Sequence, residues 1–169
     1  MEVTSIRSFL EYFGKIRERT MRVVERIPAD KLEWSYQPGR FTAGDLARHI
    51  AAVERWTFAE NVAGRPNCYT SCGRELADGC DAVLAYMRDR HAESLEILSA
   101  LADADLAKPV TTAAGTQVSA SSWLRAMIEH EIHHRGQLYI YLSLVGVEAP
   151  PLYGLTERQL AAQGAKPKG

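Results

Sequence analysis

The sequence lacks an excess of either charge. Its 169 residues include 20 lysines and arginines against 21 acidic residues, which gives a formal net charge of −1. Domains that bind nucleic acid through bulk electrostatics usually carry a clear basic excess. We therefore expect no nucleic-acid partner.

Long apolar runs are missing as well. No uninterrupted hydrophobic stretch approaches the roughly 20 residues that a membrane-spanning helix needs. The first residues carry charges at Glu2, Arg7 and Glu11, and no apolar segment of the kind found in secretory signals follows them. These two absences predict a cytoplasmic protein without a membrane partner.

Cysteine is scarce, and its three positions, Cys68, Cys72 and Cys80, all fall in one stretch. A scaffold held by disulfides normally has an even number of cysteines in a shorter, secreted chain. We interpret the three as free thiols near a loop. The spacing of Cys68 and Cys72 leaves a redox or metal-binding role open.

The sequence does contain clear helical periodicity. Apolar residues recur at steps of three and four in four segments. Thr42 and Asp45 resemble a capping box at the start of the second segment, and Gly146 is a typical stop for the fourth. The predicted helices span residues 4–27, residues 42 to about 60, residues 81–102 and residues 119–145, with a loop over residues 61–79.

These segments predict an all-α fold, a four-helix bundle with an extended connection before the fourth helix. That connection, residues 109–118, could form a small hairpin or an irregular crossover, so up-down-up-down and crossover topologies both stay open. A short helical segment is expected near residues 156–162. We expect one domain over residues 1–164 and a disordered tail over residues 165–169.

Three histidines are candidate metal ligands. At about 100° per residue, His130 and His134 both fall within the apolar sector of the fourth helix, one turn apart. His49 lies at the edge of the second helix's apolar stripe and reaches inward if these two helices are neighbours. Many His-x-x-x-His pairs are incidental, so spacing alone leaves both a metal site and hydrogen-bonded core histidines open.

Other polar residues near this pattern leave more than one role open. His91 lies in the stripe of the third helix, where it could be a fourth ligand, a proton carrier or, as we favour, a hydrogen-bonded core histidine. Glu131 and Arg135 flank the histidine stripe and could orient a ligand or bind substrate, although solvated surface charge is the simpler interpretation. His133 points away from the stripe. The pattern identifies no catalytic residue.

The opposite side of the fourth helix carries small and apolar residues: Ile132, Gly136, Ile140, Ser143 and Val147. A mid-helix glycine costs about 1 kcal/mol relative to alanine, which favours the close approach of another backbone there. We predict a homodimer packed partly through this face, with cover by the C-terminal segment as the alternative.

Two segments resemble a known family. Residues 130–137 (HEIHHRGQ) closely resemble the fourth-helix signature of the DinB/YfiT-like superfamily of metal-binding bundles, and residues 41–50 (FTAGDLARHI) resemble its second-helix motif. The connector over residues 27–32 (IPADKL) fits as well. The resemblance implies that His49, His130 and His134 bind one divalent metal ion. We expect zinc or nickel, and iron and copper also suit imidazole ligands.

The resemblance also implies a function. Characterised members include S-transferases and isomerases that use low-molecular-weight thiols such as bacillithiol or mycothiol. An ion on three histidines keeps open positions for a thiol, which coordination deprotonates so that it can attack an electrophilic substrate. The alternatives are a metal-dependent hydrolase, in which the ion activates water, and a non-catalytic metal-binding stress-response bundle.

Overall fold

The computed structural model describes residues 3–164, and the predicted tail of residues 165–169 lies outside this described part. Its four long helices are α1 (Ile6–Val24), α2 (Ala43–Val53), α4 (Cys80–Ser99) and α5 (Ala120–Leu144). A π-helical stretch, η2 (Glu54–Ala59), continues α2 into the short helix α3 (Glu60–Val62). The other elements are the 3₁₀ turns η1 (Ala29–Lys31), η3 (Arg74–Leu76) and η4 (Asp103–Ala107), the strands β1 (Pro109–Thr111) and β2 (Gln117–Ser119), and the helix α6 (Glu157–Gly164).

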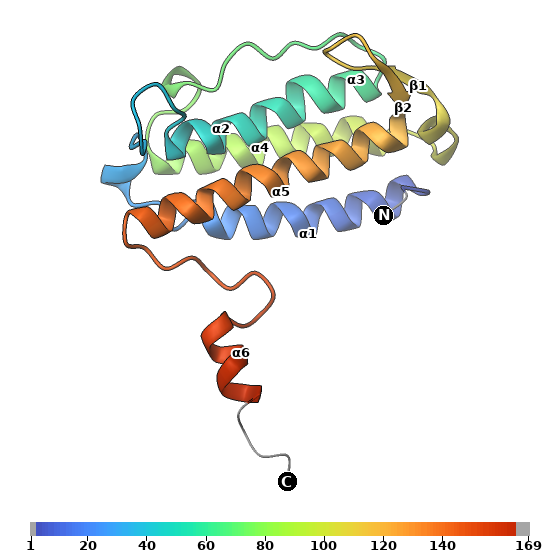
Figure 1. The fold of residues 1–169 in the computed structure, drawn as a ribbon. Coiled ribbons are helices and arrows are strands. Elements are labelled where there is room, and N and C mark those ends of the chain that lie inside the picture. The colour runs from blue at the N-terminus through green and yellow to red at the C-terminus, as the bar shows by residue number, and fades with distance from the viewer. Residues whose placement is uncertain (1–2, 165–169) are drawn as a thin grey trace.

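The structure confirms the predicted all-α bundle, with each expected long helix in place (Figure 1). Residues 109–119 form a small hairpin, in which Val110 of β1 pairs with Val118 of the antiparallel strand β2. The hairpin alternative for this connection is therefore the correct one. Within residues 3–164, no helix is both long and apolar enough to cross a membrane.

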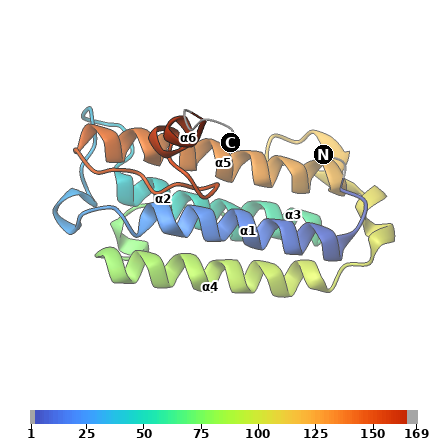
Figure 2. The same ribbon diagram turned by 90° about the horizontal axis from the view of Figure 1, so that it is seen from below.

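The topology differs from the up-down-up-down arrangement. Helices α1 and α2 each contact both α4 and α5, so α1 and α2 lie on opposite sides of the bundle. Figure 1 and Figure 2 show α1 and α5 running in one direction and α2 and α4 in the other. The crossover is the segment of residues 63–79, which connects α3 to α4 and runs back along the length of the bundle.

Local chemistry fixes the ends of the two helices that carry the candidate ligands. At α2 the predicted capping box is present: the Thr42 hydroxyl accepts from the Asp45 N–H, and the Asp45 carboxylate accepts from the Thr42 N–H. The Ser119 hydroxyl accepts from the Ser122 N–H at the start of α5. Two residues beyond the end of α5, Gly146 has φ 74°, a left-handed conformation that suits glycine.

A polar layer divides the core halfway along the bundle. One apolar cluster includes Ile50, Met87 and Leu138, and a second one towards the other end includes Phe13 and Leu124. Between these clusters every long helix contributes polar side chains: Arg17 and Thr20 from α1, His49 from α2, His91 and Ser94 from α4, and His130, Glu131, His134 and Arg135 from α5. The candidate metal ligands belong to this layer.

The outer face of α5 is open in the single chain. Ile132 and Ile140 are 38% and 60% exposed, so the C-terminal segment does not cover them. A Cβ built on Gly136 would meet nothing within 4 Å, so the expected close approach of another backbone does not occur within the described chain. Helix α6 stands away from the bundle (Figure 1), and its residues are exposed.

Candidate metal centre

The bundle brings together the three histidines that the sequence singled out. His49 comes from α2, His130 and His134 come from the neighbouring α5, and all three are half-buried. One ring nitrogen from each lies within 4.8 Å of the other two. The Nε2 atoms of His49 and His130 are 3.2 Å apart.

The surroundings keep these imidazoles uncharged at neutral pH. Burial, with a smaller effect from the nearby His134, lowers the pKa of His49 from 6.5 to about 4. Burial and the neighbouring imidazoles lower the pKa of His130 to about 3. Burial also lowers the pKa of His134. Because a metal ion binds the neutral form of imidazole, the site does not have to lose protons before it binds an ion.

Two polar contacts select the nitrogens that face the centre. The Nδ1 atom of His134 lies 2.7 Å from Oε1 of Gln137, which can only accept, so Nδ1 carries the proton and Nε2 keeps its lone pair. The amide nitrogen of Gln137 lies 3.3 Å from Nε2 of the exposed His133, which agrees with this orientation of the amide.

A loop residue makes the equivalent contact to His49. The Tyr69 hydroxyl lies 3.0 Å from His49 Nδ1. The oxygen of this hydroxyl can accept the N–H of a protonated Nδ1. The Nε2 lone pair of His49 then points at His130.

This arrangement fits a divalent metal ion. The Nε2 atoms of His49 and His130 face each other across 3.2 Å, a separation that a shared cation can bridge. Tetrahedral zinc with Zn–N bonds of about 2.0–2.1 Å places its nitrogen ligands about 3.3 Å apart. Imidazole nitrogens are also ligands that suit zinc and nickel. The residues present therefore match the ion that the resemblance implies.

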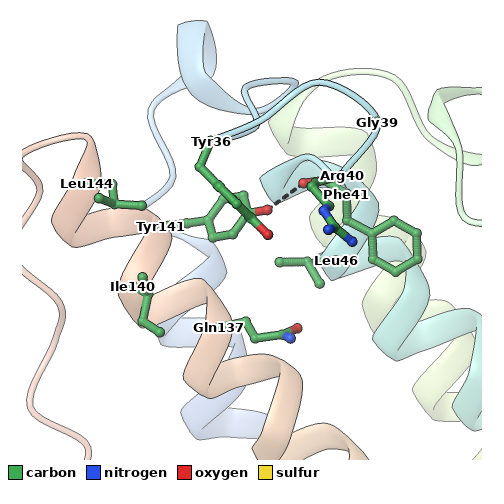
Figure 3. Close-up of a pocket in the computed structure, with 9 residues that line it drawn as sticks. All are labelled: Tyr36, Gly39, Arg40, Phe41, Leu46, Gln137, Ile140, Tyr141 and Leu144. Atoms are coloured by element: carbon green, nitrogen blue, oxygen red, sulfur yellow. Dashed lines mark hydrogen bonds between the residues drawn. The ribbon is translucent and has the colours of Figure 1, made fainter.

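Aromatic rings and a cavity adjoin the centre. The ring centroid of Phe41 lies 5.3 Å from that of His49, and the ring of Phe58 lies 5.7 Å from His130. A cavity of about 520 Å³ lies alongside, and both Phe41 and Gln137 line it (Figure 3). The cavity thus reaches residues that touch two of the three candidate ligands.

Glu131 and Arg135 are not surface charges, which corrects the simpler interpretation of the sequence. Their exposed fractions are 2% and 4%, and both face α1. Glu131 lies 3.1 Å from the guanidinium of Arg17, and Arg135 donates to the main-chain oxygen of Ile16. A helical wheel of α5 alone cannot show a partner that α1 provides.

His91 lies outside the group of three. Its Nδ1 is 2.9 Å from a carboxylate oxygen of Glu54, which also pairs with the buried Arg17. Burial and the charge of Arg17 lower its pKa to about 4, so the ring is neutral and donates to Glu54. This is the hydrogen-bonded core position that the sequence favoured, and His133 is exposed as expected.

Sequence reasoning missed Tyr69, Gln137 and the partners Arg17 and Glu54. The sequence could have identified Gln137, because this residue lies three positions after His134 and therefore on the same side of α5. Nothing in the sequence indicates Tyr69, because the crossover loop brings it to His49. The three cysteines are free, with Cys68 exposed, Cys80 half-buried and Cys72 buried.

Comparison with known proteins supports both the fold and the family. The sequence model of the DinB superfamily matches residues 12–138. The uncharacterised protein YjoA of Bacillus subtilis is 28% identical over 149 residues, which cover 85% of this chain and 93% of YjoA.

Two solved structures share the fold. A DinB-like protein from Bacillus cereus has a TM-score of 0.72 at 21% identity, over 89% of this chain and 99% of its own. The crystal structure of the DinB-like YjoA has a TM-score of 0.67 at 21% identity, over 86% of this chain and 97% of its own.

Proposed function

The chain belongs to the DinB superfamily, and from this premise we propose that it is a metalloenzyme with one divalent ion, zinc or nickel, on His49, His130 and His134. The observation that carries the proposal is the cluster of three uncharged imidazoles on two neighbouring helices. Its ring nitrogens are oriented by Gln137 and Tyr69, and a cavity for a small molecule lies beside it.

The reaction that we propose is the transfer of a low-molecular-weight thiol to an electrophile. The bound ion would lower the pKa of the thiol and so supply a thiolate at neutral pH. The sulfur forms a bond to an electrophilic carbon, the bond from that carbon to its leaving group breaks, and the leaving group departs with the electron pair. The proton of the thiol passes to solvent. The buried ring of Phe58 covers one side of His130.

Metal content tests the first part of the proposal. Protein purified without a histidine tag should contain about one zinc or nickel ion per chain, and His134→Ala should lose it. His133→Ala is the matched control, because this neighbouring histidine is exposed and lies outside the cluster. If the wild type holds no ion and takes up neither zinc nor nickel, the three histidines are polar core residues and the proposal fails.

Thiol consumption tests the second part. The metal-loaded protein, given bacillithiol and 1-chloro-2,4-dinitrobenzene, should form the thioether and release chloride, and His134→Ala should not. Hydrolysis of an ester without any thiol would instead favour the hydrolase. A loaded protein that is inactive in both assays and unfolds when the ion is removed would favour a structural metal in a non-catalytic bundle.

A further inference from the structure

The cavity beside the candidate metal centre is lined mainly by apolar surface (Figure 3). Its volume of about 520 Å³ lies within the range of roughly 300–1,000 Å³ typical of small-molecule sites. Three aromatic rings and three aliphatic side chains form most of the wall: Tyr36, Phe41, Tyr141, Leu46, Ile140 and Leu144. Such a wall favours a flat, apolar group over a polar thiol cofactor.

The aromatic side of this wall is held in place. The Tyr141 hydroxyl donates to the main-chain oxygen of Phe41 at 2.6 Å, which ties α5 to the connector before α2. The ring of Tyr141 also meets those of Trp34 and Tyr36 edge to face, each at a centroid distance of 5.8 Å. The cavity is therefore a formed site, because its wall has fixed contacts across two elements.

Among the described residues, one cation and no acidic residue line the cavity. The cation is Arg40; within residues 3–164 its main-chain N–H donates to the oxygen of Gln37, whereas its side chain has neither an ion-pair partner nor a hydrogen bond. Figure 3 shows its guanidinium beside the space between Phe41 and Tyr141. An unpaired guanidinium next to an apolar cavity is suited to a carboxylate.

We propose that this cavity binds a small apolar molecule that carries an aromatic ring and one carboxylate, with the carboxylate on Arg40. That this molecule is the electrophile of the thiol transfer rests on the proposed function. Gln137, which contacts His134, lines the same cavity, so a ring bound here lies close to the metal centre. The arrangement places the acidic group on Arg40 and the apolar body against the aromatic and aliphatic wall.

The binding of 2-naphthoate to metal-free protein tests this assignment, since a carboxylate cannot then bind an ion. Calorimetry should show one saturable site, and Arg40→Gln should weaken it by about three- to fivefold, as for a solvent-exposed ion pair. The uncharged 2-naphthalenemethanol should bind wild type and Arg40→Gln equally. Arg26→Gln is the matched control, because Arg26 is exposed and lies outside the cavity. Ile140→Gln should weaken both probes.

Three results would overturn the assignment: no binding to the metal-free protein, an equal loss in Arg26→Gln, or naphthoate binding that Arg40→Gln leaves unchanged. Thermal unfolding of Arg40→Gln should match the wild type, because within the described residues Arg40 makes a hydrogen bond through its main-chain N–H and none through its side chain. If naphthoate binds but no thiol transfer occurs, the proposed binding site stands and the proposed reaction is wrong. If thiol transfer occurs but naphthoate does not bind, only the proposed binding site is wrong.

Discussion

Gln137 and Tyr69 each hold the outer nitrogen of a candidate ligand, Nδ1 of His134 and Nδ1 of His49. In metal sites such partners fix the tautomer and the orientation of the imidazole, and losing one commonly costs ten- to a hundredfold in metal affinity. We therefore expect Gln137→Leu and Tyr69→Phe each to weaken zinc binding by about tenfold or more. Competition with a chelator of known affinity measures this change.

The control for this prediction is a polar residue that does not touch a ligand. Ser71→Ala alters the same crossover loop as Tyr69→Phe but removes only an exposed contact to Glu75, so its zinc affinity should equal that of the wild type. Zinc affinity that stays at the wild-type value in both Gln137→Leu and Tyr69→Phe would show that these contacts do not orient the ligands.

The residue scale also shows what a sequence pattern can identify. His130 and His134 could be placed on one inward face because helical periodicity is a property of a single segment. Glu131 and Arg135 were misplaced because their burial depends on Arg17 and Ile16, which lie more than 110 positions earlier. Tyr69 gave no signal at all, since its position depends on the route of a loop.

Among the elements, the crossover of residues 63–79 does more than connect two helices. It runs back along the bundle and bonds to η2 through the N–H of Cys68, which donates to the oxygen of Trp56 at 2.8 Å. This route places Tyr69 against His49 on α2. The helices and their caps were predictable from local pattern, whereas the choice of crossover depends on packing between helices that no single segment encodes.

The polar layer between the apolar clusters makes each long helix depend on its neighbours. Arg17 of α1 pairs with both Glu54 and Glu131, and all three side chains are almost fully buried. Removing one partner of a buried charge cluster leaves the others without compensation, which typically costs about 3–5 kcal/mol. Arg17→Leu should therefore lower the free energy of unfolding by about that amount in urea titrations.

Arg7→Leu provides the comparison, because Arg7 lies on the same helix and pairs with Glu11 at the surface. An exposed pair of this kind contributes about 1 kcal/mol or less. Equal effects of Arg7→Leu and Arg17→Leu on stability would mean that the buried cluster does not hold α1 to η2 and α5.

The molecule as a whole should respond to acid through its buried histidines. The pKa values of His49 and His91 are about 4 and that of His130 is about 3, all below the ordinary value of 6.5. The unfolded chain therefore takes up protons at a higher pH than the folded chain does. Stability is fully present above pH 6.5 and is lost as the pH falls towards 4.

Urea midpoints of the metal-free protein between about pH 7 and pH 4.5 measure this loss. His91→Gln should make the decline shallower, because glutamine can still donate to Glu54 but has no proton to gain. Midpoints that stay constant over this range, or an identical decline in His91→Gln, would contradict the assignment of these pKa shifts to the folded state.

The open face of α5 concerns the whole molecule, because nothing in the described chain covers it. Ile132 lies exposed on the same side as Gly136, where a Cβ would meet nothing within 4 Å, and neither residue lines the cavity that Ile140 helps to form. A second copy packed there would bury Ile132 and use the space at the glycine. Sedimentation velocity at several concentrations should therefore show a dimer, which Ile132→Glu should convert to a monomer because a carboxylate would be buried in the contact. Ala92→Glu adds the same charge at an exposed position of α4 and should leave the dimer intact. A wild type that sediments as a monomer at every concentration would rule out this interface.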